Sequence, residues 1–285
     1  MSVPADVDTA LASIRNAADS LLACPYRRGN ELLFPSEGEL MATGDLHGDI
    51  AAFDEIVRKA ALPKNPCRHL VLQELVHGKN GHDGSDGSCE LIEKAAALVE
   101  RHPARVHILM GNHEMAELTG RVMLKNGVVI NEIFRRAAQD RYGDRLEEAT
   151  ECIRAFWQAM PLAARTMNRA FFSHSTPSRK FLDTFDPAVL KRPLEQADFS
   201  RDGGSAYALL WGRDFSVETA ERLCRMLDVD FLVTGHTPCE NGFAAPNGRH
   251  IVIDSQGPNG KYLLLPLAGP LTHDEIVGRI LPVWD

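Results

Sequence analysis

Polar residues that can bind metal ions follow five short apolar segments of the sequence. They are Asp45 and His47, Glu74, Asn112 and His113, His174, and His236. A single polar residue after a strand is common, but carboxylates and imidazoles buried together cost much free energy unless a cation neutralises them. The repetition over five segments therefore predicts a metal site rather than five unrelated polar strand ends.

The residue types fit a pair of divalent ions. Two ions about 3.5–4 Å apart need a bridging carboxylate, with nitrogen and oxygen ligands on either side. Asp45 and His47 are two residues apart and project to the same side of an extended loop, and Asn112 offers an uncharged oxygen. Mixed nitrogen and oxygen donors suit Mn, Fe or Zn better than Ca. We expect two divalent ions per chain, with Mn first and Fe or Zn as alternatives.

The spacing of apolar residues predicts the elements that position these side chains. The predicted strands are 39–43, 69–76, 105–110, 170–174 and 231–234, with antiparallel strands at 250–254 and 261–267. The predicted helices are about 6–23, 50–61, 89–102, two within 114–160, and 217–227, and loops cover 77–88 and 176–205. The strand-loop-helix order with polar strand ends is typical of α/β proteins, which bind ligands at the carboxyl ends of their strands.

Composition narrows the class of protein. The 285 residues are 44% hydrophobic and 25% charged, which excludes a disordered or fibrous chain. The net charge of −8 argues against a general nucleic-acid coat.

We find no apolar run near the roughly 18 residues of a membrane span and no secretory signal, so we expect no membrane partner. Six scattered cysteines without a CxxC pair indicate free thiols and a cytoplasmic protein. The oligomeric state stays open.

Two segments resemble signature blocks of the calcineurin-like metallophosphoesterases, namely Gly44-Asp45-Leu46-His47-Gly48 and Gly111-Asn112-His113-Glu114. Residues 134–143, 156–164, 172–174, 209–211 and 234–238 resemble the phosphoprotein phosphatase branch, which also holds the diadenosine tetraphosphate hydrolases. The resemblance implies a four-layer α-β-β-α fold, with a central β-sandwich flanked by helices and a dinuclear metal site at strand carboxyl ends. We expect one domain over 1–285, with an N-terminal helix and connection (1–38), a catalytic core (39–266) and a C-terminal extension (267–285).

The resemblance also implies a role for each motif residue. Asp45 and His47 would hold the first metal, and Asn112, His174 and His236 the second. His113 would be the general acid at the leaving-group oxygen, and a water between the ions would attack phosphorus in line. Asn112 would also contact phosphate.

The second block departs from the family pattern Gly-Asp-x-x-Asp-Arg-Gly over residues 73–79. Glu74 falls at the bridging Asp, and His77 at the Asp that orients the catalytic His. Gly78 falls at the phosphate-binding Arg, so we expect a substitute, with Arg213 first and Lys79 second. A further departure is His174-Ser175-Thr176 in place of His-Gly-Gly. Arg213 could equally be a solvated surface residue.

The leading functional hypothesis is a metal-dependent phosphoesterase acting on phosphorylated Ser/Thr proteins or on small phosphoesters. One alternative is a dinucleoside polyphosphate hydrolase. Another, of a different class, is a pseudophosphatase that binds metal or phosphate without turnover, because the second block is altered.

Overall fold

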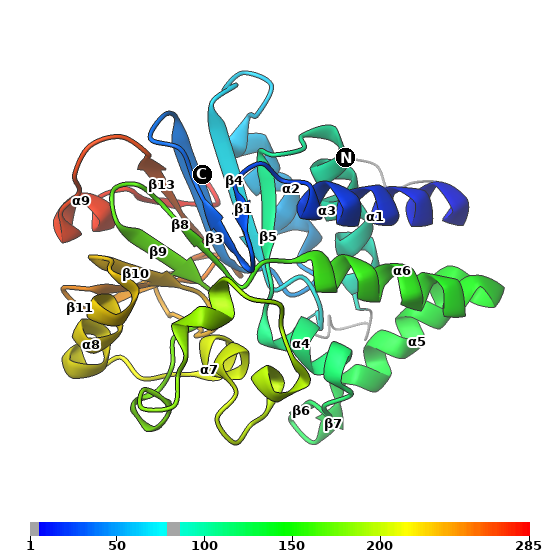
Figure 1. Ribbon diagram of the computed structural model, residues 1–285. Helices are drawn as coiled ribbons and strands as arrows, with labels where there is room; N and C mark the ends of the chain where they lie inside the picture. The colour runs from blue at the N-terminus through cyan, green and yellow to red at the C-terminus, as the bar shows by residue number, and fades with distance from the viewer. Residues whose placement is uncertain (1–5, 79–85) are drawn as a thin grey trace.

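The computed structural model describes residues 6–78 and 86–285, which form two β-sheets packed face to face between layers of helices (Figure 1). In spatial order, the first sheet contains β1 (Arg27–Arg28), β2 (Glu31–Leu33), β8 (Ala163–Arg165), β9 (Ala170–Ser173), β10 (Phe231–Thr234), β12 (His250–Ile253) and β11 (Phe243–Asn247). The second contains β14 (Ile280–Pro282), β13 (Lys261–Pro266), β3 (Glu39–Asp45), β4 (Arg68–Gln73) and β5 (Val106–Leu109). A separate hairpin pairs β6 (Leu124–Lys125) with β7 (Val128–Val129).

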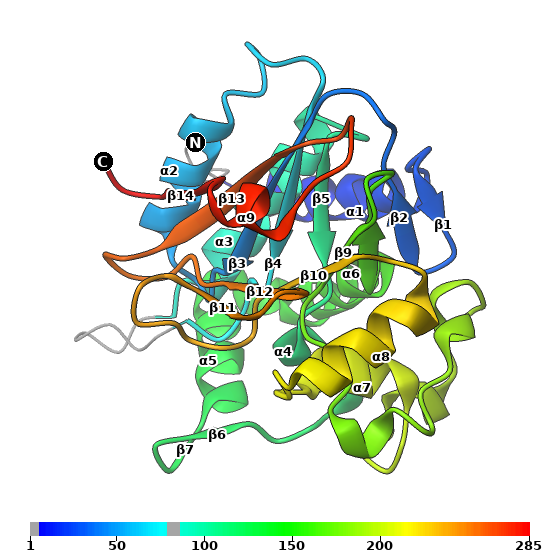
Figure 2. The same ribbon diagram turned by 90° about the vertical axis from the view of Figure 1, so that its left-hand side faces the viewer.

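The helices cover the outer faces of the two sheets, except for the short helix near the C-terminus, which covers an open edge of the sandwich and contributes Ile276 to the apolar cluster between the sheets (Figure 2). They are α1 (Val7–Leu22), α2 (Ile50–Ala60), α3 (Ser88–Arg101), α4 (Asn112–Thr119), α5 (Ile130–Tyr142), α6 (Leu146–Ala159), α7 (Ser205–Trp211), α8 (Val217–Leu227) and α9 (His273–Val277). Short 3-10 turns cover Gly143–Arg145, Arg179–Phe181, Pro187–Leu190 and Gln196–Phe199.

Alternation along the strands explains the layers. In β3 and β4, Leu40 and Val71 belong to the apolar cluster between the sheets, whereas Met41, Leu70 and Leu72 belong to the cluster beneath the helices. Successive side chains of a strand point to opposite faces, so each of these strands contributes to two cores. The predicted four-layer fold is confirmed.

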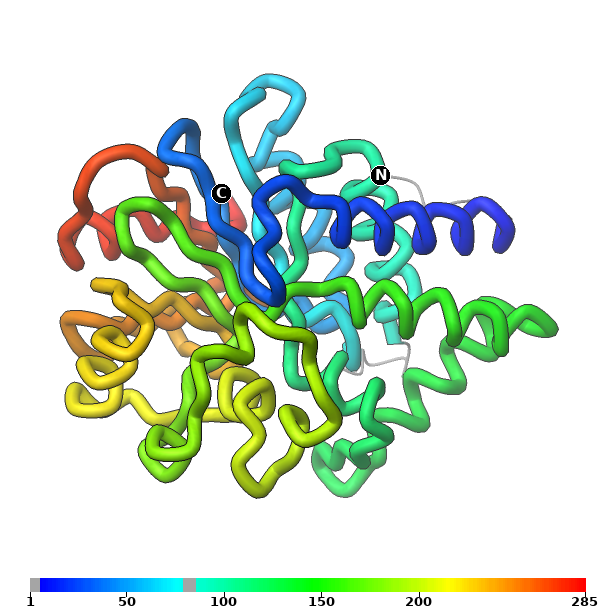
Figure 3. Tube along the Cα trace, in the orientation of Figure 1, coloured from blue at the N-terminus to red at the C-terminus, as the bar shows by residue number. Residues whose placement is uncertain are grey.

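The N-terminal helix α1 packs against α3 and α6 (Figure 3). Its N-cap Asp6 accepts a hydrogen bond from the Thr9 backbone N–H, which satisfies a free helix-end donor. Leu11 and Ile14 are fully buried, and the exposed Arg15 pairs with Glu148 of α6. The helix predicted over 6–23 is thus confirmed as part of the helical layer.

Parallel pairing brings the ends of the central strands together. Strands β3, β4 and β5 run parallel in the second sheet, and β9, β10 and β12 run parallel in the first. Their carboxyl ends meet at one edge of the sandwich, which is the edge that receives every candidate ligand.

Several predicted elements differ from the structure. The strand expected over 69–76 ends at Gln73, because Glu74 adopts the left-handed conformation with φ +52° and breaks the ladder. The strands at 250–253 and 261–266 lie in different sheets and do not pair with each other. The β6–β7 hairpin interrupts the region expected to be helical, and α7 begins at the end of the expected loop.

Within the described ranges, no helix has the length and apolar character needed to cross a membrane. The six cysteines are free thiols.

Candidate metal centre

Five strand ends place their polar side chains in one buried cluster. Asp45 ends β3, Glu74 follows β4, and Asn112 begins α4 just after β5. His174 follows β9 of the opposite sheet, and His236 lies two residues beyond β10. The backbone N–H of His236 donates to Asp45 Oδ1 at 2.8 Å, which joins the two sheets at this point.

One group of donor atoms surrounds Nε2 of the fully buried His174. This nitrogen lies 2.8 Å from Asn112 Oδ1, 2.9 Å from Glu74 Oε2 and 3.0 Å from His236 Nδ1. The other ring nitrogen of His174 lies 3.1 Å from the side-chain oxygen of Gln73, which can only accept a hydrogen bond. The proton of neutral His174 is therefore on Nδ1, and the lone pair of Nε2 faces the three other donors.

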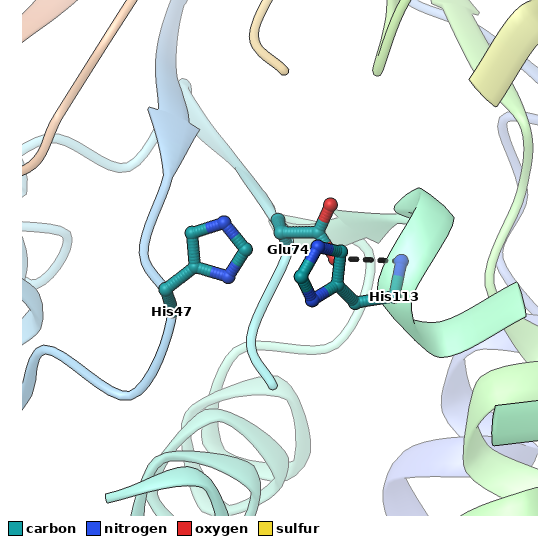
Figure 4. Close-up of side chains that lie close together, drawn as sticks. All are labelled: His47, Glu74 and His113. Atoms are coloured by element: carbon teal, nitrogen blue, oxygen red, sulfur yellow. Dashed lines mark hydrogen bonds between the residues drawn. The ribbon is translucent and has the colours of Figure 1, made fainter. Parts of the chain in front are cut away.

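A second group lies next to the first and shares Glu74 with it. One donor atom from each of His47, Glu74 and His113 lies within 4.8 Å of the other two (Figure 4). Asp45 Oδ2 lies 3.7 Å from His47 Nε2. Nδ1 of His47 lies 2.8 Å from the Val76 carbonyl, so Nδ1 donates to the carbonyl and Nε2 is left to bind a metal.

Glu74 belongs to both groups of donor atoms, and the local backbone makes room for its long side chain. Its Oε1 accepts a hydrogen bond from the His113 backbone N–H at 3.0 Å. A Cβ placed on Gly111 would lie 2.6 Å from Glu74 Cδ, so only glycine leaves space for this carboxylate. The extra methylene is therefore accommodated by the turn after β4 and by the bare backbone before α4.

Burial shapes the charge of the centre. It raises the pKa of the Asp45 carboxyl, and it raises that of Glu74 well above its usual range with help from nearby Asp45. It lowers the pKa of His47 to about 3, and those of His174 and His236 also fall. The imidazoles are thus neutral and ready to bind metal, while at the two carboxyl groups the effect of burial outweighs that of their stabilising neighbours.

This donor set fits divalent metal ions. Lone pairs and carboxylate oxygens face one another at hydrogen-bond distance, an arrangement that repels unless a cation lies between them. Glu74 Oε2 and His236 Nε2 are buried and find no hydrogen-bond partner among the described residues. Buried polar atoms are normally paired, so these two atoms mark places for a ligand.

His113 is linked to two residues outside the metal-ligand set. Its Nδ1 lies 2.8 Å from Nδ1 of His77, and Nε2 of His77 lies 2.7 Å from Glu117 Oε1. Burial and the neighbouring imidazoles, His47 first among them, lower the pKa of His113 well below its usual value.

The structure describes only one of the two candidate side chains, Arg213 and Lys79, for binding phosphate in place of the missing arginine. Arg213 is exposed, and its guanidinium donates to the His236 carbonyl at 3.3 Å, so it lies at the rim of the cluster. Its positive charge contributes to lowering the pKa of the adjacent His236. Lys79 lies outside the described residues.

Sequence reasoning missed two residues of the centre. The first is Gln73, which the sequence indicates only as part of the altered block. Its side-chain oxygen accepts a hydrogen bond from Nδ1 of His174, and its side-chain nitrogen donates to the Thr43 carbonyl at 2.7 Å. The second is Glu117, which lies outside the predicted motifs. Its place four residues after His113 on α4 was the available signal, because residues i and i+4 share a helix face.

The calcineurin-like phosphoesterase family matches residues 39–240, and the chain belongs to this family. The predicted family is confirmed, and with it the expectation of divalent metal ions. The range covers each strand end that carries a candidate ligand.

Two curated relatives are serine/threonine-protein phosphatases. One from Caenorhabditis elegans is 24% identical over 240 residues, covering 78% of this chain and 48% of its own length. A probable one from Encephalitozoon cuniculi is 24% identical, covering 97% of this chain and 59% of its own length. The chain thus spans about half the length of the curated relatives it matches. The predicted phosphatase-like hydrolase is confirmed at the level of the family.

Solved structures share the fold. A serine/threonine phosphatase from Saccharomyces cerevisiae superimposes with a TM-score of 0.69 at 20% identity, covering 90% of this chain and 82% of its own. A cold-active protein-tyrosine phosphatase from a Shewanella species has a TM-score of 0.58 at 18% identity, covering 84% and 77%. At these identities the likeness is one of fold.

Proposed function

We propose that this protein is a metal-dependent phosphatase that hydrolyses phosphate monoesters. The observation that carries the proposal is the convergence of six donor side chains from both sheets, two of them with unpartnered buried atoms. The six are Asp45, His47, Glu74, Asn112, His174 and His236.

The donors divide into two ion sites that share one carboxylate. Asp45 and His47 would hold one ion, and Asn112, His174 and His236 the other, with Glu74 between them. When bound, divalent ions here lower the pKa of water and neutralise charge on phosphoryl oxygens. Mn²⁺ is our first choice, with Fe or Zn as alternatives, because the donors mix nitrogen and oxygen.

The remaining residues act on the substrate. His113 donates a proton from Nε2 to the leaving-group oxygen, because its Nδ1 is occupied by His77. Arg213 binds the phosphoryl oxygens in place of the arginine absent at Gly78, and Asn112 and Lys79 are further candidate phosphate contacts. A planar guanidinium offers two parallel donors, which suits this role better than an ammonium.

We place phosphoserine and phosphothreonine proteins first among the substrates and small phosphoesters second. Both curated relatives are protein phosphatases, which supports this order. A dinucleoside polyphosphate hydrolase would need a free aromatic ring for its base. Tyr207 and Trp211, just before Arg213, stack on each other, and the Arg121 guanidinium lies over them at 5.0 and 5.3 Å. These two rings are therefore not free to stack on a base.

The whole chain from 1 to 285 is proposed to act as one catalytic domain. We also propose the cytoplasm as its compartment, since free thiols suit a reducing environment.

The test is hydrolysis of p-nitrophenyl phosphate, a phosphothreonine peptide and diadenosine tetraphosphate by the Mn²⁺-loaded protein. We expect turnover of the first two, with loss of activity in Asn112→Ala and a lower metal content. Metal binding without turnover would instead identify a pseudophosphatase. Faster turnover of the dinucleotide would overturn the proposed substrate class.

A further inference from the structure

We propose that Glu117 is a positioning residue for the general acid, and that it acts on His113 through His77. This inference rests on the proposed phosphatase function and adds a residue to it. The family pattern places an aspartate against the catalytic histidine, whereas this chain has His77 there. An imidazole alone brings no negative charge, and Glu117 supplies that charge one step further out.

The three side chains form a continuous hydrogen-bonded row. Nδ1 of His113 lies 2.8 Å from Nδ1 of His77, and Nε2 of His77 lies 2.7 Å from Glu117 Oε1. The side chain of His77 is fully buried, with Phe134 edge-on at a ring separation of 6.0 Å. The imidazole is therefore held in one orientation, and both of its nitrogens are occupied within the row.

The carboxylate of Glu117, at the end of the row, determines which ring nitrogens of His77 and His113 carry a proton. A carboxylate only accepts, so His77 carries its proton on Nε2 and donates it to Glu117. Nδ1 of His77 is then a lone pair, and it accepts the N–H of His113 Nδ1. Nε2 of His113 then carries a proton only in the imidazolium, which the negative charge of Glu117 favours through His77, and this is the proton given to the leaving oxygen when the P–O bond breaks. The water that attacks phosphorus supplies the proton that restores His113.

Glu117 has a second partner, which suggests a competing explanation. The same oxygen accepts a hydrogen bond from Asn131 Nδ2 at 2.7 Å. Asn131 in turn accepts from the Met123 backbone N–H at 2.7 Å and donates to the Arg121 carbonyl at 3.2 Å, which anchors the β6–β7 hairpin. The competing explanation is that Glu117 only anchors the hairpin, and the experiment separates this role from the effect on His113.

The test compares Glu117→Gln with Asn131→Ala in the Mn²⁺-loaded protein. Glutamine keeps the shape and an accepting oxygen but removes the charge. We expect kcat for an alkyl phosphate to fall by about tenfold or more, part of the 10²–10⁴ that general acid catalysis contributes. With p-nitrophenyl phosphate, whose leaving group needs little protonation, we expect less than about a threefold change, with KM and metal content unchanged.

Asn131→Ala is the matched control, because it removes the hairpin anchor and leaves the carboxylate beside His77. We expect it to treat the two substrates alike. If Asn131→Ala reproduces the leaving-group selectivity of Glu117→Gln, or if Glu117→Gln slows both substrates equally, the inference is wrong. Absence of turnover by the parent with every substrate would instead contradict the proposed function itself.

A second arm uses His77→Asp, which puts a carboxylate directly against His113. In that background Glu117→Gln should no longer change the leaving-group dependence, so the effects of the two substitutions should not add.

Nitrogen-15 spectra of the His77 ring give a readout independent of activity. They should show the Nε2–H form in the parent and a mixture of forms in Glu117→Gln. A full effect of Glu117→Gln in the His77→Asp background would overturn the inference.

Discussion

Four residues of the centre have backbone conformations that side chains rarely adopt. His47, Glu74, His77 and His236 have φ values of +44°, +52°, +61° and +66°. Each such residue costs of the order of 1–3 kcal/mol and persists only where the surroundings hold it. These conformations lower the stability of the fold, but they turn the four side chains toward the cluster. In a regular strand, successive side chains would point to alternate faces.

Glu74 gives the sharpest test at the scale of single residues. Glu74→Gln keeps the side-chain volume and removes the negative charge between the two ion sites. We expect it to lower the affinity for at least one metal ion and to abolish turnover. Elemental analysis of the purified variant, together with an assay on p-nitrophenyl phosphate, measures both effects.

Glu74→Asp serves as the companion variant. Its carboxylate is shorter by about 1.5 Å, one C–C bond, and the turn after β4 is built for the longer arm. We therefore expect it to be less active than the parent. Several-fold higher activity would mean that this site has drifted from a better one that used aspartate.

Arg213→Ala tests phosphate capture. Loss of one bidentate contact to a charged phosphate costs on the order of 2–4 kcal/mol in the transition state. We expect kcat/KM to fall by roughly thirty- to a thousandfold. Arg179→Ala is the control, since this exposed arginine pairs with Glu218 away from the cluster. A change of less than about threefold in Arg213→Ala would pass the role to Lys79.

At the scale of elements, the turn from β5 into α4 serves several functions at once. It places Asn112 in the ligand cluster and offers the His113 backbone N–H to Glu74. Glu114 closes the helix start by accepting from the Gly111 backbone N–H at 3.1 Å and from the Leu75 N–H at 2.7 Å. The N-terminus of α4 and the turn after β4 are thus tied to each other next to the candidate ligands.

Gly111→Ala should damage the centre through this turn. The new Cβ would lie 2.6 Å from Glu74 Cδ and 2.6 Å from Glu114 Oε2, both buried and unable to move freely. We expect loss of metal and activity, read by elemental analysis and by assay. Gly120→Ala, at the other end of α4, is the control, because nothing lies within 4 Å of its Cβ. It should cost about 1–2 kcal/mol for its positive φ and keep the metals. Equal metal contents in the two variants would contradict the prediction.

The sequence predicted the ligand-bearing strand ends because apolar runs and polar stops are local features. It did not predict β1, β2, β8, β11 or β14, which are two to five residues long. β2 and β8 depend on pairing with each other across the chain, whereas β1 and β11 are short edge strands paired only with the next strand. The contact of Gln73 with His174, 101 positions away, was out of reach. For Glu117 the spacing from His113 indicated a shared helix face, but not its contact with His77, 40 positions away. Metal-ligand motifs are visible in sequence, whereas the residues that orient the ligands depend on tertiary packing.

At the scale of the whole molecule, a second histidine cluster lies between the sheets near the amino ends of β4 and β5, away from the metal centre. Nδ1 of His69 lies 3.2 Å from Nε2 of His107, and Cys24 Sγ lies 3.9 Å from the other ring nitrogen of His107. Burial lowers the pKa of His107 to about 3, with a smaller effect from His69, whose own pKa burial lowers to about 4. Both imidazoles are thus neutral parts of the core.

This pair should make stability depend on pH. The folded-state pKa of His107 lies below the ordinary value of 6.5, so as pH falls below 6.5 the unfolded chain binds a proton that the folded chain excludes. Stability is therefore full above about pH 6.5 and declines toward pH 3. His107→Phe removes the contribution of His107 and leaves that of His69 in place. Between pH 7.5 and 5, we expect the parent to lose about 2 kcal/mol more unfolding free energy than the variant.

Urea unfolding at the two pH values measures this difference, with His273→Phe as the control. His273 lies at the start of α9, outside the buried pair, with a quarter of its side chain exposed, so its replacement controls for the loss of a histidine as such. Equal losses in the parent and in His107→Phe would show that His107 contributes nothing to the loss of stability in acid.

The division of the ligands between two sheets has a consequence for how the protein folds and unfolds. Asp45 and His236, joined by a hydrogen bond, are separated by 191 positions in the chain, so the two half-sites meet only once both sheets have formed and docked. Interactions that form after the rate-limiting step leave the folding rate unchanged and slow the reverse reaction. Bound metal ions should therefore stabilise the folded state after the rate-limiting step of folding, and so slow unfolding. Their removal by a chelator should speed unfolding many-fold, while the rate of refolding changes little.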